Sequence, residues 1–372
     1  MTGARPQPAE PALSGRCSTR DYMMISIQYT RVAGRWLLGS IPVFLCASAA
    51  AQIHLDPEPH IVPEVYLDTQ AALNAINANA TLQFFPVSGN VYLLGDPRGG
   101  TNVTVQIGDE GVLVVDSGSA EHAAETLEMV QRISTQPLRY LLNTTGLPAY
   151  TGANDQLGEA GLGYEGVGAR GLGRTTGISH ENAMVMMASN ADPPNTGAGY
   201  PNLAFFNMHQ PIFFNGETID IFHQPNANTN TEAIVVFRKS DVVSAGPLFL
   251  TTTYPEIYPE EGGTIDGVIE ALNRILDITN TRKNQEGGTM VISGEGRITD
   301  EAGVAEYRDM LTIIRARIAH YMEQGMSLDE IRAAQPTMDY DGRYAAEEGP
   351  AEPASFVEII YDHLLQSRGD RS

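Results

Sequence analysis

The side chains best suited to chemistry in this sequence are two carboxylates and one tyrosine that lie within two residues of glycine or proline. Glu295 lies between two glycines, Asp116 ends an apolar run before Ser-Gly, and Tyr150 follows Pro-Ala. A carboxylate in a partly buried pocket can have a raised pKa and act as a general acid or base. A strand-end carboxylate more often satisfies loop N–H groups. Glu295 therefore has both a catalytic and a structural interpretation, and Asp116 is expected to form a turn.

Histidine and cysteine do not form a motif of their own. None of the 8 histidines has metal-ligand spacing with another. His180 and His223 adjoin polar loops, and lone histidines near strand ends are usually structural. If a metal were bound, Glu295 with Asp116 and one of these two histidines would be the least unfavourable ligand set. No Gly-x-Ser-x-Gly elbow occurs, so an α/β-hydrolase nucleophile is not expected.

Composition and the N-terminal segment limit the compartment and the partners. The formal net charge is −22, from 23 Lys and Arg against 45 Asp and Glu, which argues against binding nucleic acid or an anionic membrane. Residues 31–51 carry two arginines, a short apolar run and then small residues, which is typical of a secretory signal peptide. We expect cleavage near Ala51 and an exported, periplasmic or secreted protein with no stable membrane anchor. Both cysteines, Cys17 and Cys46, would leave with this leader.

Short apolar runs alternate with helical patterns along the rest of the chain. Strands are expected at 91–94, 103–107, 112–116, 138–142, 233–237, 241–245 and 289–293, and Asn215-Gly216 predicts a hairpin. Helical spacing predicts helices at 120–133, 265–276 and 304–322. Capping boxes at Ser327 and Ser355 predict two short C-terminal helices. Hairpins and crossovers together imply an α/β sandwich with helices on the outer sheet faces.

The order of several motifs resembles the metallo-β-lactamase superfamily. These motifs are Gly89-Asn-Val-Tyr-Leu, Gly111-Val-Leu-Val-Val-Asp-Ser-Gly118, Leu141-Leu-Asn-Thr144, His223-Gln-Pro and Gly262-Gly263. The resemblance implies a four-layer αββα sandwich with its active site at the loops along one edge of the two sheets. It also divides the chain into a leader (1–51), an N-terminal extension (52–83), a metallo-β-lactamase-like domain (84–324) and a C-terminal helical extension (325–372).

The same comparison indicates that this chain lacks the metal ligands on which the chemistry of the family depends. Where the family has His-x-His-x-Asp-His, this chain has Thr145, Leu147, Ala149 and Tyr150. Its Ala-His-Thr motif corresponds to Asn228, its bridging Asp to Pro247, and its Gly-His-Gly to Glu295. Zinc requires three or four imidazole, thiolate or carboxylate donors, and only Glu295 remains suitable. We therefore expect neither zinc nor another cofactor.

A polar pocket is nevertheless expected at the loop edge. It would contain the residues at the former ligand positions and their neighbours: Asp116, Thr145, Leu147, Ala149, Tyr150, His180, His223, Asn228, Pro247 and Glu295. Two glycine- and proline-rich loops, 158–173 and 190–200, are expected to adjoin it as a binding surface.

Three functions follow from this pattern. The first is a non-catalytic pseudoenzyme that binds an unknown small molecule or protein partner. The second is a divergent hydrolase or lyase that uses Glu295 and Tyr150 as catalytic residues. The third is a scaffold subunit of an assembly.

Overall fold

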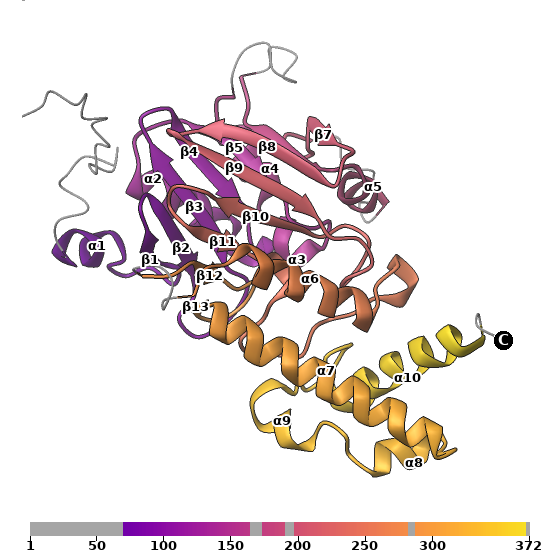
Figure 1. Ribbon diagram of the computed structural model, residues 1–372. Helices are drawn as coiled ribbons and strands as arrows, with labels where there is room; N and C mark the ends of the chain where they lie inside the picture. Colours follow the sequence, from indigo (N-terminus) through magenta and orange to yellow (C-terminus); the bar gives the residue numbers. More distant parts are fainter. Residues whose placement is uncertain (1–69, 164–172, 190–196, 282–286, 370–372) are drawn as a thin grey trace, which may run out of the picture. The chain divides into compact units, whose positions relative to one another are not determined.

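Two sheets form the centre of the part of the chain that the computed structural model describes, residues 70–163, 173–189, 197–281 and 287–369. The predicted signal peptide lies outside these residues. The first sheet has the order β1 (Gln83–Ser88), β2 (Val91–Gly95), β3 (Val103–Gly108), β4 (Gly111–Val115), β5 (Leu138–Leu142), β6 (Thr176–His180), β7 (Leu203–Phe205). The second has the order β13 (Ile298–Asp300), β12 (Met290–Ile292), β11 (Val242–Ser244), β10 (Ala233–Phe237), β9 (Glu217–His223), β8 (His209–Phe214). Figure 1 labels these strands.

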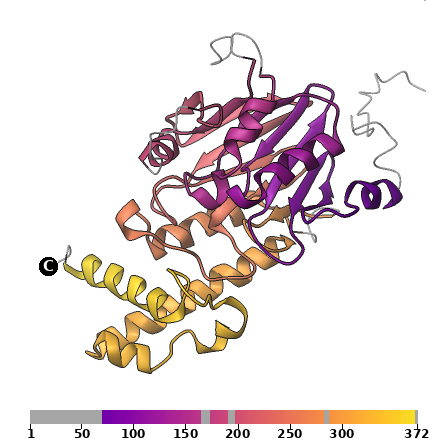
Figure 2. The ribbon, with the colours of Figure 1, turned by 180° about the vertical axis from the view of Figure 1, so that it is seen from behind.

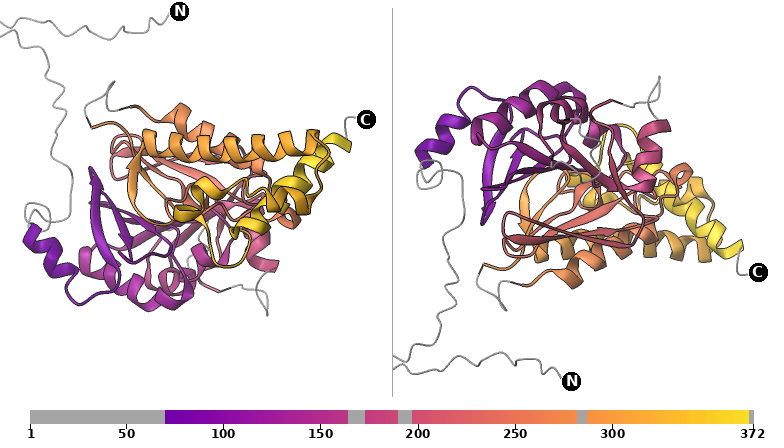
Figure 3. Two further views of the ribbon diagram at one scale, coloured as in Figure 1. Left: turned by 90° about the horizontal axis from the view of Figure 1, so that it is seen from below. Right: turned by 90° about the horizontal axis from the view of Figure 1, so that it is seen from above.

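Helices cover the outer face of each sheet. The first group comprises α1 (Gln70–Ile76), α2 (Ala123–Ile133), α3 (Pro148–Thr151), α4 (Asn154–Ala160) and α5 (Glu181–Ser189). On the other side lie α6 (Ile265–Ile278) and α7 (Glu301–Glu323), followed by α8 (Leu328–Ala333), α9 (Met338–Tyr344) and α10 (Pro353–Gly369). The two views of Figure 3 show the sheets between these groups, and Figure 2 shows α2 and α4 from behind. The predicted αββα sandwich is confirmed.

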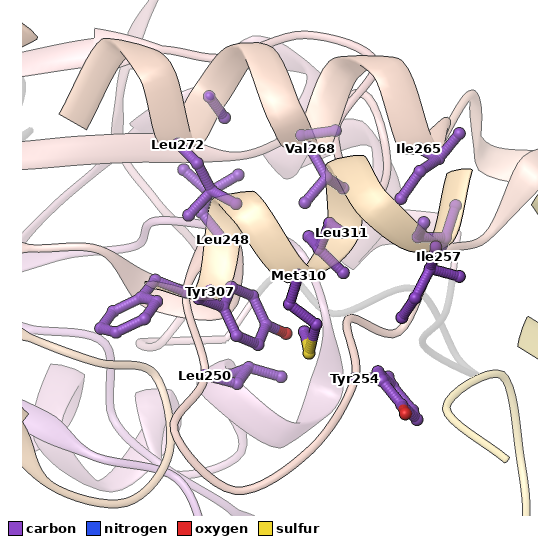
Figure 4. Packing of buried hydrophobic residues seen from close by; sticks show 14 of the residues in the cluster. Leu248, Leu250, Tyr254, Ile257, Ile265, Val268, Leu272, Tyr307, Met310 and Leu311 are labelled. Carbon is purple, nitrogen blue, oxygen red and sulfur yellow. The ribbon is translucent and has the colours of Figure 1, made fainter. Parts of the chain in front are cut away.

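Three apolar layers follow from the alternation of side chains along the strands. In β4, Val112 and Val114 face the helices α1, α2 and α4, whereas Leu113 and Val115 face the second sheet. Both faces of β4 are buried, which explains its continuous apolar run. The third layer joins the second sheet to α6 and α7; Figure 4 shows Val268 and Leu272 packed near Leu311 and Leu248. It also includes Phe356 and Ile360 of α10, so the C-terminal helices share this core.

Local signals explain most of the element boundaries. The Asn215-Gly216 turn joins β8 and β9 with positive φ at both residues, 51° and 75°, as the prediction required. Thr264 caps α6 by accepting the Gly267 N–H, and the predicted capping box at Ser327 is present. The capping box at Ser355 is wrong. Helix α10 begins at Pro353, because proline suits the first helical turn, and Ser355 donates its N–H to the upstream Glu352.

The strand directions determine where the site lies. Strands β4, β5, β6 and β7 are parallel neighbours, so their carboxyl ends share one edge. Strands β11 and β12 are also parallel. The two edges are joined directly, because Ala233 of the second sheet donates its N–H to Thr144 O at 2.7 Å. Among the described residues, no helix has the length and apolar character needed to cross a membrane.

Candidate functional site

Asp116 sits at the end of β4 and binds the first loop of the site. It has a φ of 58°, a left-handed conformation that Asp tolerates better than most residues. Its side chain is 2% exposed and accepts two hydrogen bonds from Thr144, from N–H at 2.8 Å and from Oγ1 at 2.6 Å. Burial raises the pKa of Asp116 to about 7, although the Thr144 hydrogen bonds oppose the shift. Asp116 therefore holds the start of the 144–151 loop.

Thr145, which the motif order aligns with the first ligand position of the family, belongs to a buried hydroxyl cluster around Glu232. Glu232 accepts hydrogen bonds from Thr145 Oγ1 at 3.2 Å, Thr229 Oγ1 at 2.7 Å and Thr231 Oγ1 at 3.3 Å. The Thr229 N–H donates to the second carboxylate oxygen at 2.9 Å. Burial raises the pKa of Glu232, and these hydrogen bonds limit the increase. We call Thr145, Thr229, Thr231 and Glu232 the Thr-Glu cluster. It joins the 144–151 loop to the 224–232 loop.

The next three positions that the motif order aligns with family ligands lie on and before α3. Leu147 is half-buried, Ala149 is exposed and Tyr150 is 5% exposed. The Tyr150 hydroxyl points toward Gly294, since a Cβ built there would lie 2.7 Å from it and 2.3 Å from Gly246 O. The Tyr150 pKa is raised well above its ordinary value, first by burial and then by the charge of Glu295. The tyrosine is therefore a neutral phenol that fills the space between the two loops.

The remaining aligned positions lie in loops that follow strands of the second sheet. Asn228 is fully buried and donates to Glu256 O at 2.9 Å, while its Oδ1 has no hydrogen-bond partner among the described residues. Pro247 is buried in a short 3₁₀ turn. Glu295 is half-buried and accepts a hydrogen bond from Thr252 Oγ1 at 3.2 Å. Burial raises its pKa, so its neutral form is favoured relative to an exposed glutamate.

His180 and His223 meet at the end of β6 and β9. Their rings stack with centroids 3.6 Å apart and an interplanar angle of 11°. His180 Nδ1 accepts the Asn182 N–H at 3.3 Å, and His223 Nε2 lies 3.1 Å from Asn230 O. The stacked pair therefore contacts the 224–232 loop through His223 and Asn230 O.

The donor set at this edge does not fit a metal ion. Leu147, Ala149 and Pro247 offer no side-chain donor atom, the Thr145 hydroxyl belongs to the Thr-Glu cluster, and zinc needs three or four strong donors. Across the ranges that the structure describes, no group of three His, Cys, Asp or Glu side chains could hold a metal ion.

Sequence reasoning missed two residues of this edge. Glu232 carries four hydrogen bonds, and the run Thr229-Asn-Thr231-Glu232 next to the altered ligand motif was the available signal. Asn102 precedes β3 and donates from Nδ2 to Ser293 O at 2.9 Å and Gly296 O at 3.0 Å. It thereby clamps the loop that carries Glu295.

A cavity of about 470 Å³ opens beside this loop, between β1 and β2 on one side and β13 on the other. Thr252, the partner of Glu295, is among its lining residues, whereas the predicted pocket residues are not. The predicted glycine- and proline-rich loops are described only in part, since residues 164–172 and 190–196 lie outside the described ranges.

Comparison with known proteins supports the class of fold. No family model and no curated protein matches this chain. Among solved structures, the inverting sec-alkylsulfatase Pisa1 from Pseudomonas sp. has a TM-score of 0.56 at 12% identity, over 79% of this chain and 55% of that one. A double mutant of the same sulfatase gives 0.56 at 14% identity, over 76% and 50%. A metallo-β-lactamase from Pontibacter korlensis gives 0.46 at 14% identity, over 62% and 99%.

The similarity to the sec-alkylsulfatase shows the fold alone, and this is the metallo-β-lactamase fold that the motif order predicted. The chain spans about half the length of the sec-alkylsulfatase that it matches.

Proposed function

We propose that this chain is a metal-free, non-catalytic binding protein with the metallo-β-lactamase fold. The observation that carries the proposal is the state of the former ligand positions. Thr145 hydrogen-bonds within the Thr-Glu cluster, Asn228 donates to a backbone carbonyl, and Tyr150 is buried between two loops. These groups hold the loops at the sheet edge together by direct contacts. In a metalloprotein, a metal ion that several loops share has this role.

Elemental analysis tests the proposal. The mature protein, expressed with zinc supplied, should carry far less than one equivalent of tightly bound transition metal. Treatment with a strong chelator should leave its circular dichroism and melting temperature unchanged, because the loops are joined by hydrogen bonds. One or two equivalents of metal would falsify the proposal.

We further propose that the protein acts outside the cytoplasm, because residues 31–51 have the composition of a signal peptide. Expression of the full chain with fractionation and N-terminal sequencing tests this point. The expected mature N-terminus lies close to Gln52. An intact leader in a cytoplasmic fraction would contradict it.

A second candidate, a divergent acid–base hydrolase or lyase, is favoured by one observation. Glu295 has a raised pKa and its charge acts on the neighbouring Tyr150 phenol, so two proton-bearing groups adjoin each other. An activity of this kind would survive a strong chelator and would be abolished in Glu295→Gln. Turnover unchanged in that variant would remove Glu295 from catalysis.

A further inference from the structure

The cavity of about 470 Å³ is an open end of the apolar layer between the two sheets. Phe85 of β1, Leu93 of β2 and Ile298 of β13 line it, and the same residues belong to or pack against the core between the sheets. Its volume lies within the range of about 300 to 1,000 Å³ found for small-molecule pockets. An apolar chain entering here would therefore contact the side chains that the two sheets already share.

The polar side chains of the lining already have partners in the protein. Asn102 Nδ2 donates to backbone carbonyls of the 293–296 loop. Thr251 Oγ1 donates to Glu295 O and accepts the Arg297 N–H. Thr252 Oγ1 donates to the Glu295 carboxylate at 3.2 Å. A ligand that relied on these groups would have to break existing hydrogen bonds, which costs affinity.

The charged side chains of the lining are one ion pair, Asp96 with Arg98, and Arg297. Asp96 accepts hydrogen bonds from Arg98 Nε at 3.0 Å and Nη2 at 2.6 Å, so these two charges offset each other. Arg297 is exposed, and the described residues give its guanidinium no hydrogen bond, ion pair or ring contact. Two cations and one anion line the cavity, and because Asp96 pairs with Arg98, Arg297 is the charge left available to a ligand.

We propose that this cavity binds an amphiphile with a single anionic headgroup, whose apolar chain lies against Phe85, Leu93 and Ile298 and whose head binds Arg297. A guanidinium pairs with carboxylate or sulfate through two parallel hydrogen bonds. The apolar lining gains free energy by burying the hydrocarbon chain. The proposal deepens the proposed binding function and rests on it, because the amphiphile is a ligand and no bond is broken.

Calorimetric titration of the mature protein with decanoate, below its micelle concentration, tests the site. Decanol and decyltrimethylammonium carry a chain one methylene longer with a neutral or cationic head, and both should bind at least tenfold more weakly. Decyl sulfate should also bind. Its affinity relative to decanoate shows which anionic head the site prefers. Failure of decanoate to bind, or equal binding of decanol, overturns the proposal.

Three variants assign the binding to this cavity. Arg297→Met should weaken decanoate about tenfold or more and leave decanol unchanged. Arg368→Met, on α10, removes one positive charge elsewhere and should leave both unchanged. Ile298→Thr should weaken both probes. Retained decanoate affinity in Arg297→Met, or an equal loss in Arg368→Met, overturns the assignment.

The two proposals fail separately. A protein that binds decanoate as expected but also carries one equivalent of zinc contradicts the proposed function and leaves the cavity assignment intact. A metal-free protein that ignores decanoate contradicts the assignment alone.

Discussion

His180 stacks on His223 at a centroid distance of 3.6 Å and so joins the first sheet to the second at the loop edge. Burial lowers the pKa of both rings, to about 4 for His180, because desolvation penalises the imidazolium. The neighbouring His223 ring contributes to this lowering of the His180 pKa. At neutral pH the pair is therefore an uncharged stack.

Acid should weaken this contact. Between pH 6.5 and about 4 the unfolded chain binds a proton at His180 that the folded chain does not, so stability falls as pH falls through this range. From pH 7 to 4.5, wild type should lose about 2 kcal/mol more free energy of unfolding than His180→Phe. Urea unfolding at both pH values measures the difference. His320→Phe, at an exposed position of α7, is the control and should behave as wild type.

Asp116 should give the opposite pH dependence. Its pKa of about 7 exceeds the ordinary value of 3.8, so between these values the folded chain binds the extra proton and stability falls as pH rises. Asp116→Asn does not titrate, and it tolerates the positive φ. Its stability relative to wild type should therefore increase from pH 5 to 7, by at most about 1.4 kcal/mol per pH unit. A constant difference across this range would show that Asp116 has an ordinary pKa.

Removing the carboxylate of the Thr-Glu cluster should be strongly destabilising. Glu232→Ala removes the acceptor of three buried hydroxyls and of the Thr229 N–H, and leaves the hydroxyls only their contacts with one another. The expected cost is about 3 to 5 kcal/mol in urea unfolding. Glu232→Gln, which keeps one acceptor oxygen, should cost less. Glu260→Ala, at an exposed position, should change little, and a similarly small effect of Glu232→Ala would mean that the cluster is dispensable.

Asn102 should control the mobility of the loop that carries Glu295. Asn102→Ala removes the donors to Ser293 O and Gly296 O. We expect a loss of about 1 to 3 kcal/mol in stability and faster amide hydrogen exchange at residues 293–297. If amides 293–297 of Asn102→Ala exchange at the wild-type rate, the loop is held by other contacts, such as those of Thr251.

The sequence predicted the elements whose signal is local. The apolar run of β4, the Asn215-Gly216 hairpin and the helical stripe of α6 each specify their own structure, and all are present. Strand β6 was not predicted, because Thr176-Gly-Ile-Ser-His180 carries few β-formers and is a strand by virtue of its neighbours β5 and β7. The edge strand β1 contains Pro86, which weakens the strand pattern.

The contacts at the site could not be predicted from the sequence, because they join residues that are far apart along the chain. The motif order located the loop edge, but the Asn102 clamp joins residues 191 positions apart. The role of Glu232 depends on three threonines from two loops, and stacking of His180 on His223 requires both sheets. Spacing within one segment could not specify these pairs.

Gly294 has a consequence for engineering. With Gly246 O at 2.3 Å and the Tyr150 hydroxyl at 2.7 Å from where its Cβ would stand, the backbone and the phenol ring close the gap between the two loops. Imidazoles grafted onto Thr145, Leu147 and Asn228 would therefore lie beside a phenol that already fills the space next to Gly294. A designer who wants to install a hydrolytic centre in this chain must first shorten the side chain at Tyr150 and let the loops separate.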